Sequence, residues 1–305
     1  MRAVTELTVL TWNIFHGRDA PPDDNLFTWR SRLLRVTEDN GTYIQVNRPL
    51  REEYASLIAG APWEVCLLQE APPSWTRRLA ERAGADGCRA LTSRNQLGLL
   101  SGALARLNPD LVGSLEGGSN VTLARPPWRL VSGSCRSLLL NPLRERGVNE
   151  RRRMSFARLQ LDGQAVEVCV ANLHASTGPQ EQIERELRRA ARTAAEWAGP
   201  APLVLGGDFN VRPRRASELF DELAGDVGLV APTGPDAIDH LLVRGLDVVA
   251  APAAWPDEKR ELEITRNAGK RRLRLSDHPP VEARFRIRRQ GQSTHVRGAI
   301  TTGDG

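Results

Sequence analysis

Residues 202–210, PLVLGGDFN, join what reads as a buried strand to a polar end. The branched aliphatic residues 203–205 predict a strand in the core, and glycines 206–207 follow directly. Without side chains, those glycines let the backbone turn sharply and approach a ligand closely. Asp208 and Asn210 stand two apart, so in an extended segment their side chains point to the same side. We therefore expect this strand to end in a carboxylate and an amide that face one ligand.

The segments before this stretch predict a mixed fold. Residues 179–198 carry an apolar stripe with helical spacing, with Thr177 and Gln180 in capping-box positions, so strand, helix and strand form a βαβ unit. Residues 154–174 alternate on both sides of Asp162-Gly163, a dipeptide typical of a type I′ hairpin. Hairpin and βαβ signals together predict an α/β protein with a mixed, largely antiparallel sheet system.

Other elements follow from shorter patterns. We expect further strands at 5–14, 63–70, 97–104, 134–140, 238–243, 246–250 and 281–287. We expect helices near 27–36, 51–59 and 216–224, the first within a long loop region over 18–50. One domain over 1–288 with a frayed polar tail over 289–305 accounts for the whole pattern.

Composition describes an ordinary globular chain. The 305 residues are 40% hydrophobic and 26% charged, and no run approaches the ~20 apolar residues of a membrane span. The N-terminus does not have the pattern of a secretory signal, and the four widely spaced cysteines form no CxxC pair, so we expect buried, reduced thiols in a cytoplasmic protein. The net charge of +5 is compatible with a polyanionic partner, although genome composition explains an arginine bias equally well.

Six polar clusters stand at or beside strand ends. They are TWN with Asn13, LLQE with Glu70, ANLH with Asn172 and His174, GGDFN with Asp208 and Asn210, AIDH with Asp239, and SDH with Asp277 and His278. Strand ends at one edge of a sheet can converge although they are distant in sequence. Carboxylate and amide oxygens suit a hard cation such as Mg²⁺ or Mn²⁺ rather than zinc. Phosphate chemistry uses such a set, because a metal neutralises the negative charge of the phosphate and a carboxylate orients the attacking water.

The ordered series TWN, LLQE, NLH, GGDFN, IDH and SDH resembles the endonuclease/exonuclease/phosphatase superfamily over residues 8–287. Each motif alone is weak, whereas six in the right order at plausible spacing are specific. The resemblance implies a four-layer α/β/β/α sandwich of two mixed, mostly antiparallel sheets. It also implies a hydrolase that acts on phosphoester bonds and uses Mg²⁺, with Mn²⁺ as a substitute.

The resemblance also assigns roles to the metal and water ligands. Glu70 resembles the metal-binding glutamate, with Asn13 beside it. Asp208 resembles the residue that orients or deprotonates the attacking water, and Asn210 the residue that helps hold that water and the phosphate.

The histidines are assigned in the same way. His174 resembles a donor to a phosphoryl oxygen, and His278 a phosphate contact. Asp239 resembles a polarising or leaving-group carboxylate and Asp277 a metal-side carboxylate. The sequence leaves open which of these two aspartates pairs with His278.

Three further residues are candidates for substrate binding, each with an alternative structural role. They are Asn172, His16 and Arg212, the last in a basic stretch after GDFN. Arginine at the rim of a site suits a polyphosphate or a nucleic-acid backbone.

Three functions are compatible with these motifs. A metal-dependent nuclease acting on DNA or RNA is favoured by the basic rim and by the deoxyribonuclease-like NLH. The same chemistry on a small-molecule, nucleotide or lipid-headgroup phosphoester is the alternative, with residues 18–50 or 106–133 forming a specificity loop. A non-catalytic binding module is disfavoured because Glu70, Asp208, Asn210 and His278 are all present. No stretch indicates a protein partner.

Overall fold

The first of two large sheets contains the N-terminal strand and the last strand of the domain. The computed structural model describes residues 6–92, 103–104, 106–112, 118–141, 152–266 and 269–287. The sheet order is β13 (Leu246–Ala254), β16 (Val281–Ile287), β1 (Glu6–Asn13), β4 (Val65–Ala71), β6 (Ser119–Ala124) and β5 (Asp86–Leu91). β1 and β4 are parallel, with Asn13 opposite Gln69, and the other neighbours are antiparallel. The polar end of β1 therefore lies beside the polar end of β4.

The second sheet carries the PLVLGGDFN strand. Its order is β12 (Asp239–Arg244), β11 (Leu203–Asp208), β10 (Glu167–His174), β9 (Arg153–Leu161) and β7 (Trp128–Leu130), with β8 (Arg136–Leu139) also paired to β9. β10 and β11 are parallel and are joined by helix α6 (Gln180–Ala198), while the other pairs are antiparallel. The predicted βαβ unit is therefore present.

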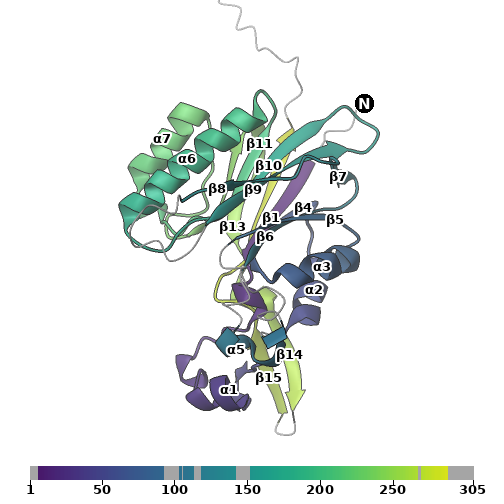
Figure 1. Ribbon diagram of the computed structural model, residues 1–305, viewed down its shortest axis with the longest axis vertical. Helices are drawn as coiled ribbons and strands as arrows, with labels where there is room; N and C mark the ends of the chain where they lie inside the picture. Colours follow the sequence, from purple (N-terminus) through teal and green to yellow (C-terminus); the bar gives the residue numbers. More distant parts are fainter. Residues whose placement is uncertain are drawn as a thin grey trace, which may run out of the picture.

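Helices cover the outer faces of both sheets (Figure 1). α6 and α7 (Ser217–Val227) pack on the second sheet, and α2 (Arg51–Gly60) and α3 (Thr76–Ala83) pack on the first. Buried aliphatic side chains of both sheets form the layer between them, as the mainly apolar strands dictate. The result is the four-layer α/β/β/α sandwich that the resemblance implied.

A smaller assembly, here the lower lobe, projects from one end of the sandwich (Figure 1). We define it as residues 18–50, 106–112 and 257–275. Its elements are α1 (Trp29–Leu34), β2 (Glu38–Asp39), β3 (Ile44–Gln45), α5 (Pro109–Val112), β14 (Glu261–Arg266) and β15 (Gly269–Arg274). In the described residues of the lobe and of the sandwich, the chain also forms short 3-10 helices, namely η1 (Phe15–Gly17), η2 (Asp24–Leu26), η3 (Pro73–Trp75), η6 (Pro213–Arg215) and η7 (Asp257–Arg260). Ile44 and Ile264 pack in the apolar cluster that the first sheet forms with α2 and α3, so the lobe is packed onto the domain.

Two local predictions are wrong. β9 ends at Leu161 and β10 begins at Glu167, and Gly163 has φ of 68° while Asp162 is not in the positive-φ region. The connection is therefore wider than a two-residue type I′ turn, which needs positive φ at both central residues. The predicted capping box is also absent, because Pro179 is the N-cap of α6 and no side chain caps the helix there.

Other sequence predictions have mixed outcomes. The hairpin β14–β15 was not predicted. The strand predicted at 97–104 and the tail predicted at 289–305 lie largely or wholly outside the described residues. Cys66 and Cys169 are buried as expected, but Cys135 is exposed. Among the described helices, none combines the length and apolar character needed to cross a bilayer.

Candidate active site

Strand register in the second sheet aligns three of the predicted site residues. His174 lies opposite Asp208 in the β10–β11 pair, and Asp208 lies opposite Asp239 in the β11–β12 pair. All three end or begin their strands at one edge of the sheet, where the described parts of loops from both sheets meet. This register explains how residues 65 positions apart in sequence become neighbours.

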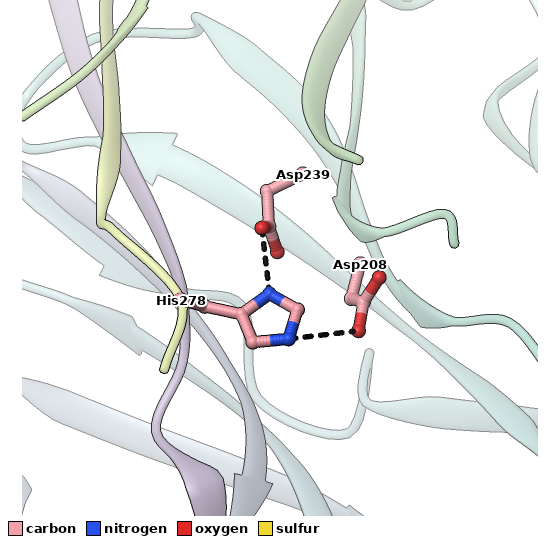
Figure 2. Close-up of side chains that lie close together, drawn as sticks. All are labelled: Asp208, Asp239 and His278. Carbon is pink, nitrogen blue, oxygen red and sulfur yellow. Dashed lines mark hydrogen bonds and ion pairs between the residues drawn. The ribbon is translucent and has the colours of Figure 1, made fainter. Parts of the chain in front are cut away.

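The loop before β16 brings His278 against this edge. His278 Nδ1 lies 2.8 Å from Asp239 Oδ2, and His278 Nε2 lies 4.0 Å from Asp208 Oδ2 (Figure 2). Ser276 holds the loop in place, because its hydroxyl donates to the Asn13 carbonyl at 2.6 Å and accepts from the His278 amide at 3.1 Å. The structure thus pairs His278 with Asp239, the alternative that the sequence left open.

Asp208 is buried and receives two hydrogen bonds. Asn13 Nδ2 donates to its Oδ2 at 3.0 Å, and the Asn210 backbone amide donates to its Oδ1 at 2.9 Å. The Asn210 side-chain amide donates to the Ala175 carbonyl at 3.1 Å, which fixes the turn after β11. The carboxylate is therefore held rigidly, as the opening motif suggested.

Glu70 joins the group through two histidines. His174 Nε2 lies 3.6 Å from Glu70 Oε1 and 3.5 Å from Asp208 Oδ2, and His16 Nε2 lies 3.2 Å from Glu70 Oε2. A continuous series of contacts therefore runs from His16 through Glu70, His174 and Asp208 to His278. The predicted strand ends from both sheets do converge.

Backbone strain gathers at the same place. His16, Glu70, Asn210 and Ser276 have φ of 52°, 51°, 53° and 60°, in the region that non-glycine residues rarely adopt. Glu70 lies at an irregularity in the β4–β6 pairing. Such strain costs of order 1–3 kcal/mol for each residue and typically marks functional sites, where packing enforces it.

The electrostatics separate the protonation behaviour of Asp208 and His278. Burial, followed by the charge of Asp239, raises the pKa of Asp208 to about 7, against the opposing effects of His278 and Asn13. Burial lowers the pKa of His278, but the charge and hydrogen bond of Asp239 outweigh it and raise the pKa to about 10. His278 is therefore an imidazolium at neutral pH, with Nε2–H directed toward the group.

His174 behaves in the opposite way. Burial, and then the charges of Arg152, His278 and His16, lower its pKa well below the ordinary value, so the ring is neutral. Arg152 Nη1 lies 2.9 Å from His174 Nδ1 and 3.1 Å from His174 Nε2. We assign Nδ1 as the acceptor from the shorter contact, which leaves the proton on Nε2, facing Asp208 and Glu70.

Arg152 is a site residue that the sequence analysis did not single out. It is 7% exposed and lies just before β9, and its guanidinium reaches His174 on the neighbouring strand β10. The sequence shows it only as the middle of a run of three arginines, which is typical of a solvated face. A buried guanidinium therefore adds positive charge beside His174.

The described carboxylates fit a divalent cation, whereas the protonated ring of His278 is a neighbouring donor and not a ligand. Single ligand atoms of Asp208, Asp239 and His278 all lie within 4.8 Å of one another. Asp239 Oδ1 is buried without a hydrogen-bond partner, and Glu70 adds a partly exposed carboxylate to the same group. This oxygen-rich donor set suits Mg²⁺ or Mn²⁺.

Two predicted site residues lie apart from the group. Asn172 is fully buried, donates to the Leu68 and Val121 carbonyls and accepts from Gln69 Nε2, so it links the two sheets and does not face a substrate. Asp277 is exposed, and its carboxylate accepts from the neighbouring Ser276 hydroxyl at 3.4 Å. Assigning Asn172 to substrate and Asp277 to the metal is therefore not supported by their positions.

Arg212 also has a structural partner. Its Nε donates to the Asp236 carbonyl at 3.1 Å, and the side chain is partly exposed. This contact stabilises the loop after β11. A role for Arg212 in substrate binding stays a prediction.

Comparison with known proteins agrees with this geometry. The model of the endonuclease/exonuclease/phosphatase family matches residues 10–278. The chain belongs to this family. Its members are phosphoester hydrolases, so the protein is a hydrolase of that class. No protein with a curated description matches the sequence significantly.

Solved structures show the same fold at low sequence identity. A family protein from Bacteroides thetaiotaomicron has a TM-score of 0.64 at 15% identity, covering 94% of this chain and 100% of that one. A mannosyl-6-phosphatase from the same species has a TM-score of 0.62 at 15% identity, covering 92% and 99%. Truncated TDP2 from Caenorhabditis elegans has a TM-score of 0.53 at 14% identity, covering 92% and 98%.

Proposed function

We propose that this enzyme is a divalent-metal-dependent phosphodiesterase that cleaves nucleic acid by in-line attack of water. The observation that carries the proposal is the continuous contact series of Glu70, His174, Asp208, His278 and Asp239 at one edge of the sandwich. It combines carboxylates for a cation and a water with donors for phosphoryl oxygens.

Asp208 is the residue that orients the attacking water. Its carboxylate is fixed by Asn13 and by the Asn210 amide, so little reorientation is needed as the reaction proceeds. Its raised pKa of about 7 makes it a stronger base than an ordinary aspartate. A cation bound beside it would oppose that rise, because positive charge favours the carboxylate form.

Two histidines and one arginine contribute positive charge and hydrogen-bond donors. His278, kept protonated by Asp239, offers Nε2–H to a phosphoryl or leaving-group oxygen. His174 offers Nε2–H in its neutral form, with Arg152 behind it. Donors positioned where negative charge develops stabilise the transition state, commonly by about 3 kcal/mol each.

Glu70 and Asp208 would hold the cation, with the Asn13 amide beside them. When bound, Mg²⁺ would neutralise charge on the phosphoryl group and polarise it toward attack. His16 contacts the opposite oxygen of Glu70 and so holds that carboxylate in place.

The decisive assay compares substrates with and without metal. Plasmid DNA, single-stranded DNA, RNA and bis-(p-nitrophenyl) phosphate are incubated with the purified chain in Mg²⁺, in Mn²⁺ and in EDTA. We expect cleavage of a nucleic acid that EDTA abolishes and added Mg²⁺ restores. Cleavage of the small diester alone would refute the nuclease assignment and leave a small-molecule phosphodiesterase.

A matched pair of variants ties the activity to the site. Asp208→Asn preserves shape but removes the base, and should lower kcat by about 10²–10⁴-fold. Asp236→Asn changes an exposed aspartate that pairs with Arg214 at 2.8 Å, and should leave kcat unchanged. Equal activity of both variants would refute the assigned role of Asp208.

A further inference from the structure

The lower lobe is joined directly to the loops that carry active-site residues. Asp19 forms a β-bridge with Leu275, and the Ser276 amide donates to the Arg18 carbonyl at 3.1 Å. The bridge therefore lies three residues from His278 on one strand and follows the η1 turn that carries His16 on the other. A ligand on the lobe and a phosphate in the site can belong to the same molecule.

The lobe contains an arginine-lined cavity of about 330 Å³. Arg35, Arg48 and Arg266 line it together with the Thr37 hydroxyl, and Ile44 and Ile264 are among its apolar lining residues. No acidic residue is among those that line it. The polar part of the lining thus combines three cationic groups with two neutral residues, Thr37 and Asn47.

Two nearby carboxylates are already paired with guanidinium groups, one of them with the lining Arg48. Glu53 Oε1 lies 2.6 Å from Arg48 Nη2, and Asp39 Oδ1 lies 2.9 Å from Arg271 Nε. Asp39 also interacts electrostatically with Arg266, without a direct ion pair. Arg35 donates through Nε to the Asn47 carbonyl at 3.3 Å, which orients its guanidinium without neutralising it. In the described part of the chain, the three lining arginines and Arg271 therefore outnumber these two carboxylates, and the cavity keeps a positive excess.

We infer that this cavity binds a backbone phosphate of the nucleic acid whose scissile phosphate lies at Asp208 and His278. The inference rests on the proposed nuclease function and specifies how its substrate is held. Guanidinium groups match phosphate oxygens in charge and geometry, and phosphate contacts position a nucleic acid without reading its sequence.

The hairpin carries the cavity away from the sandwich. β14 has six residues, begins at Glu261 opposite Arg274, four residues before His278, and ends at Arg266 (Figure 1). At ~3.3 Å for each residue, the strand spans roughly 20 Å from the base of the lobe to the cavity. With one phosphate on each strand for every ~3.4 Å of duplex, a nucleic acid must extend at least about six base pairs from the base of the lobe to reach the cavity.

The test removes the two unpaired charges and keeps the active site intact. Arg35→Gln/Arg266→Gln is compared with wild type and with Arg129→Gln/Arg192→Gln, which loses the same charge from β7 and α6. Substrates are bis-(p-nitrophenyl) phosphate and duplexes of about 4 and about 20 base pairs, one too short and one long enough to reach the cavity. Duplex affinity is measured in EDTA by fluorescence anisotropy over a salt series.

The cavity variant should hydrolyse the small diester and the short duplex as wild type does. On the long duplex, the slope of log Kd against log salt should fall in magnitude by about 0.9, the value for one lost phosphate contact. Between 50 and 200 mM salt, the affinity advantage of wild type should therefore shrink by about 3.5-fold. The control pair should keep the wild-type slope.

The outcomes separate this inference from the proposed function. If wild type cleaves DNA but the cavity variant keeps the wild-type slope and length dependence, the cavity assignment is wrong and the nuclease proposal stands. If wild type cleaves no nucleic acid, both are wrong.

α1 next to the cavity exposes three large apolar side chains, those of Trp29, Leu33 and Leu34. Binding to phosphatidylserine vesicles that the cavity variant loses, without any change toward DNA, would show that the lobe serves a lipid surface instead.

Discussion

Replacing Gly207 with alanine should destabilise the protein more than replacing any neighbouring glycine. Gly207 has φ of 138°, and a Cβ there would lie 1.9 Å from the Leu173 carbonyl oxygen. Leu173 is its register partner on β10, so the obstacle is backbone that cannot move without breaking the β10–β11 pairing. The collision and the unfavourable φ act together at one residue.

Two other glycines serve as matched comparisons. At Gly206 a Cβ would lie 2.6 Å from Leu241 Cδ2, the end of a flexible side chain, and overpacking of this kind costs about 1–3 kcal/mol. At Gly163, φ is 68° but nothing lies within 4 Å, so the cost is only that of the left-handed backbone, about 1–2 kcal/mol. For Gly207→Ala we expect a loss above about 4 kcal/mol, beyond the range of ordinary substitutions.

Urea unfolding followed by tryptophan fluorescence measures these differences, because Trp12, Trp63 and Trp128 are fully buried and report on the core. The expected order of unfolding midpoints is wild type, Gly163→Ala, Gly206→Ala and Gly207→Ala, from most to least stable. Failure of Gly207→Ala to fold at all agrees with this order. If instead it unfolds within about 1 kcal/mol of Gly163→Ala, the close approach of β10 and β11 does not explain the glycine.

Three further predictions concern the site and the core. Asp239→Asn removes the partner of His278 at 2.8 Å, so kcat on a phosphodiester should fall by about 10²-fold or more in protein that is still folded by tryptophan fluorescence, and retained activity would contradict the pairing. Asn172→Ala leaves two buried carbonyls without donors and should cost about 2–4 kcal/mol in urea unfolding while KM stays unchanged; a raised KM with normal stability would instead restore its substrate role. Burial raises the pKa of Asp19 to about 8 from about 3.9 in the unfolded chain, so the folded state retains a proton that the unfolded state releases. The free energy of unfolding should then fall between pH 4 and 8, by as much as about 5 kcal/mol, and Asp19→Asn should remove most of this slope; equal slopes would show that Asp19 is ionised in the fold.

Local sequence patterns predicted the elements whose signal lies within a few turns or residues. The apolar stripe of α6 and the aliphatic run of β11 each face a core, so their periodicity records burial directly. The hairpin β14–β15 was not predicted although Leu262 and Ile264 alternate with glutamates and pack with Leu273 against the core. This alternation covers only a few residues among many charges, such as the Lys270–Glu263 pair, so its local signal is short.

Residue roles that depend on register were not readable from the chain. Asp239 and Asp277 both stand next to a histidine in sequence, and only the pairing of β11 with β12, together with the Ser276 loop before β16, places Asp239 beside His278. The positive φ of Ser276 belongs to a turn that leaves Asp277 exposed. Asn172 resembled a strand-end ligand, but the packing of the two sheets buries its amide between them.

The sequence by itself determined which chemical groups are available and the order in which they reach strand ends, because motif composition and hydrophobic period are properties of short segments. Only the tertiary structure decided which carboxylate serves His278, that Arg152 is buried against His174, and that three distant segments build an arginine-lined lobe beside the site. These depend on how strands from two sheets align and how far the charges are removed from water, and both are set by contacts between residues far apart in the chain.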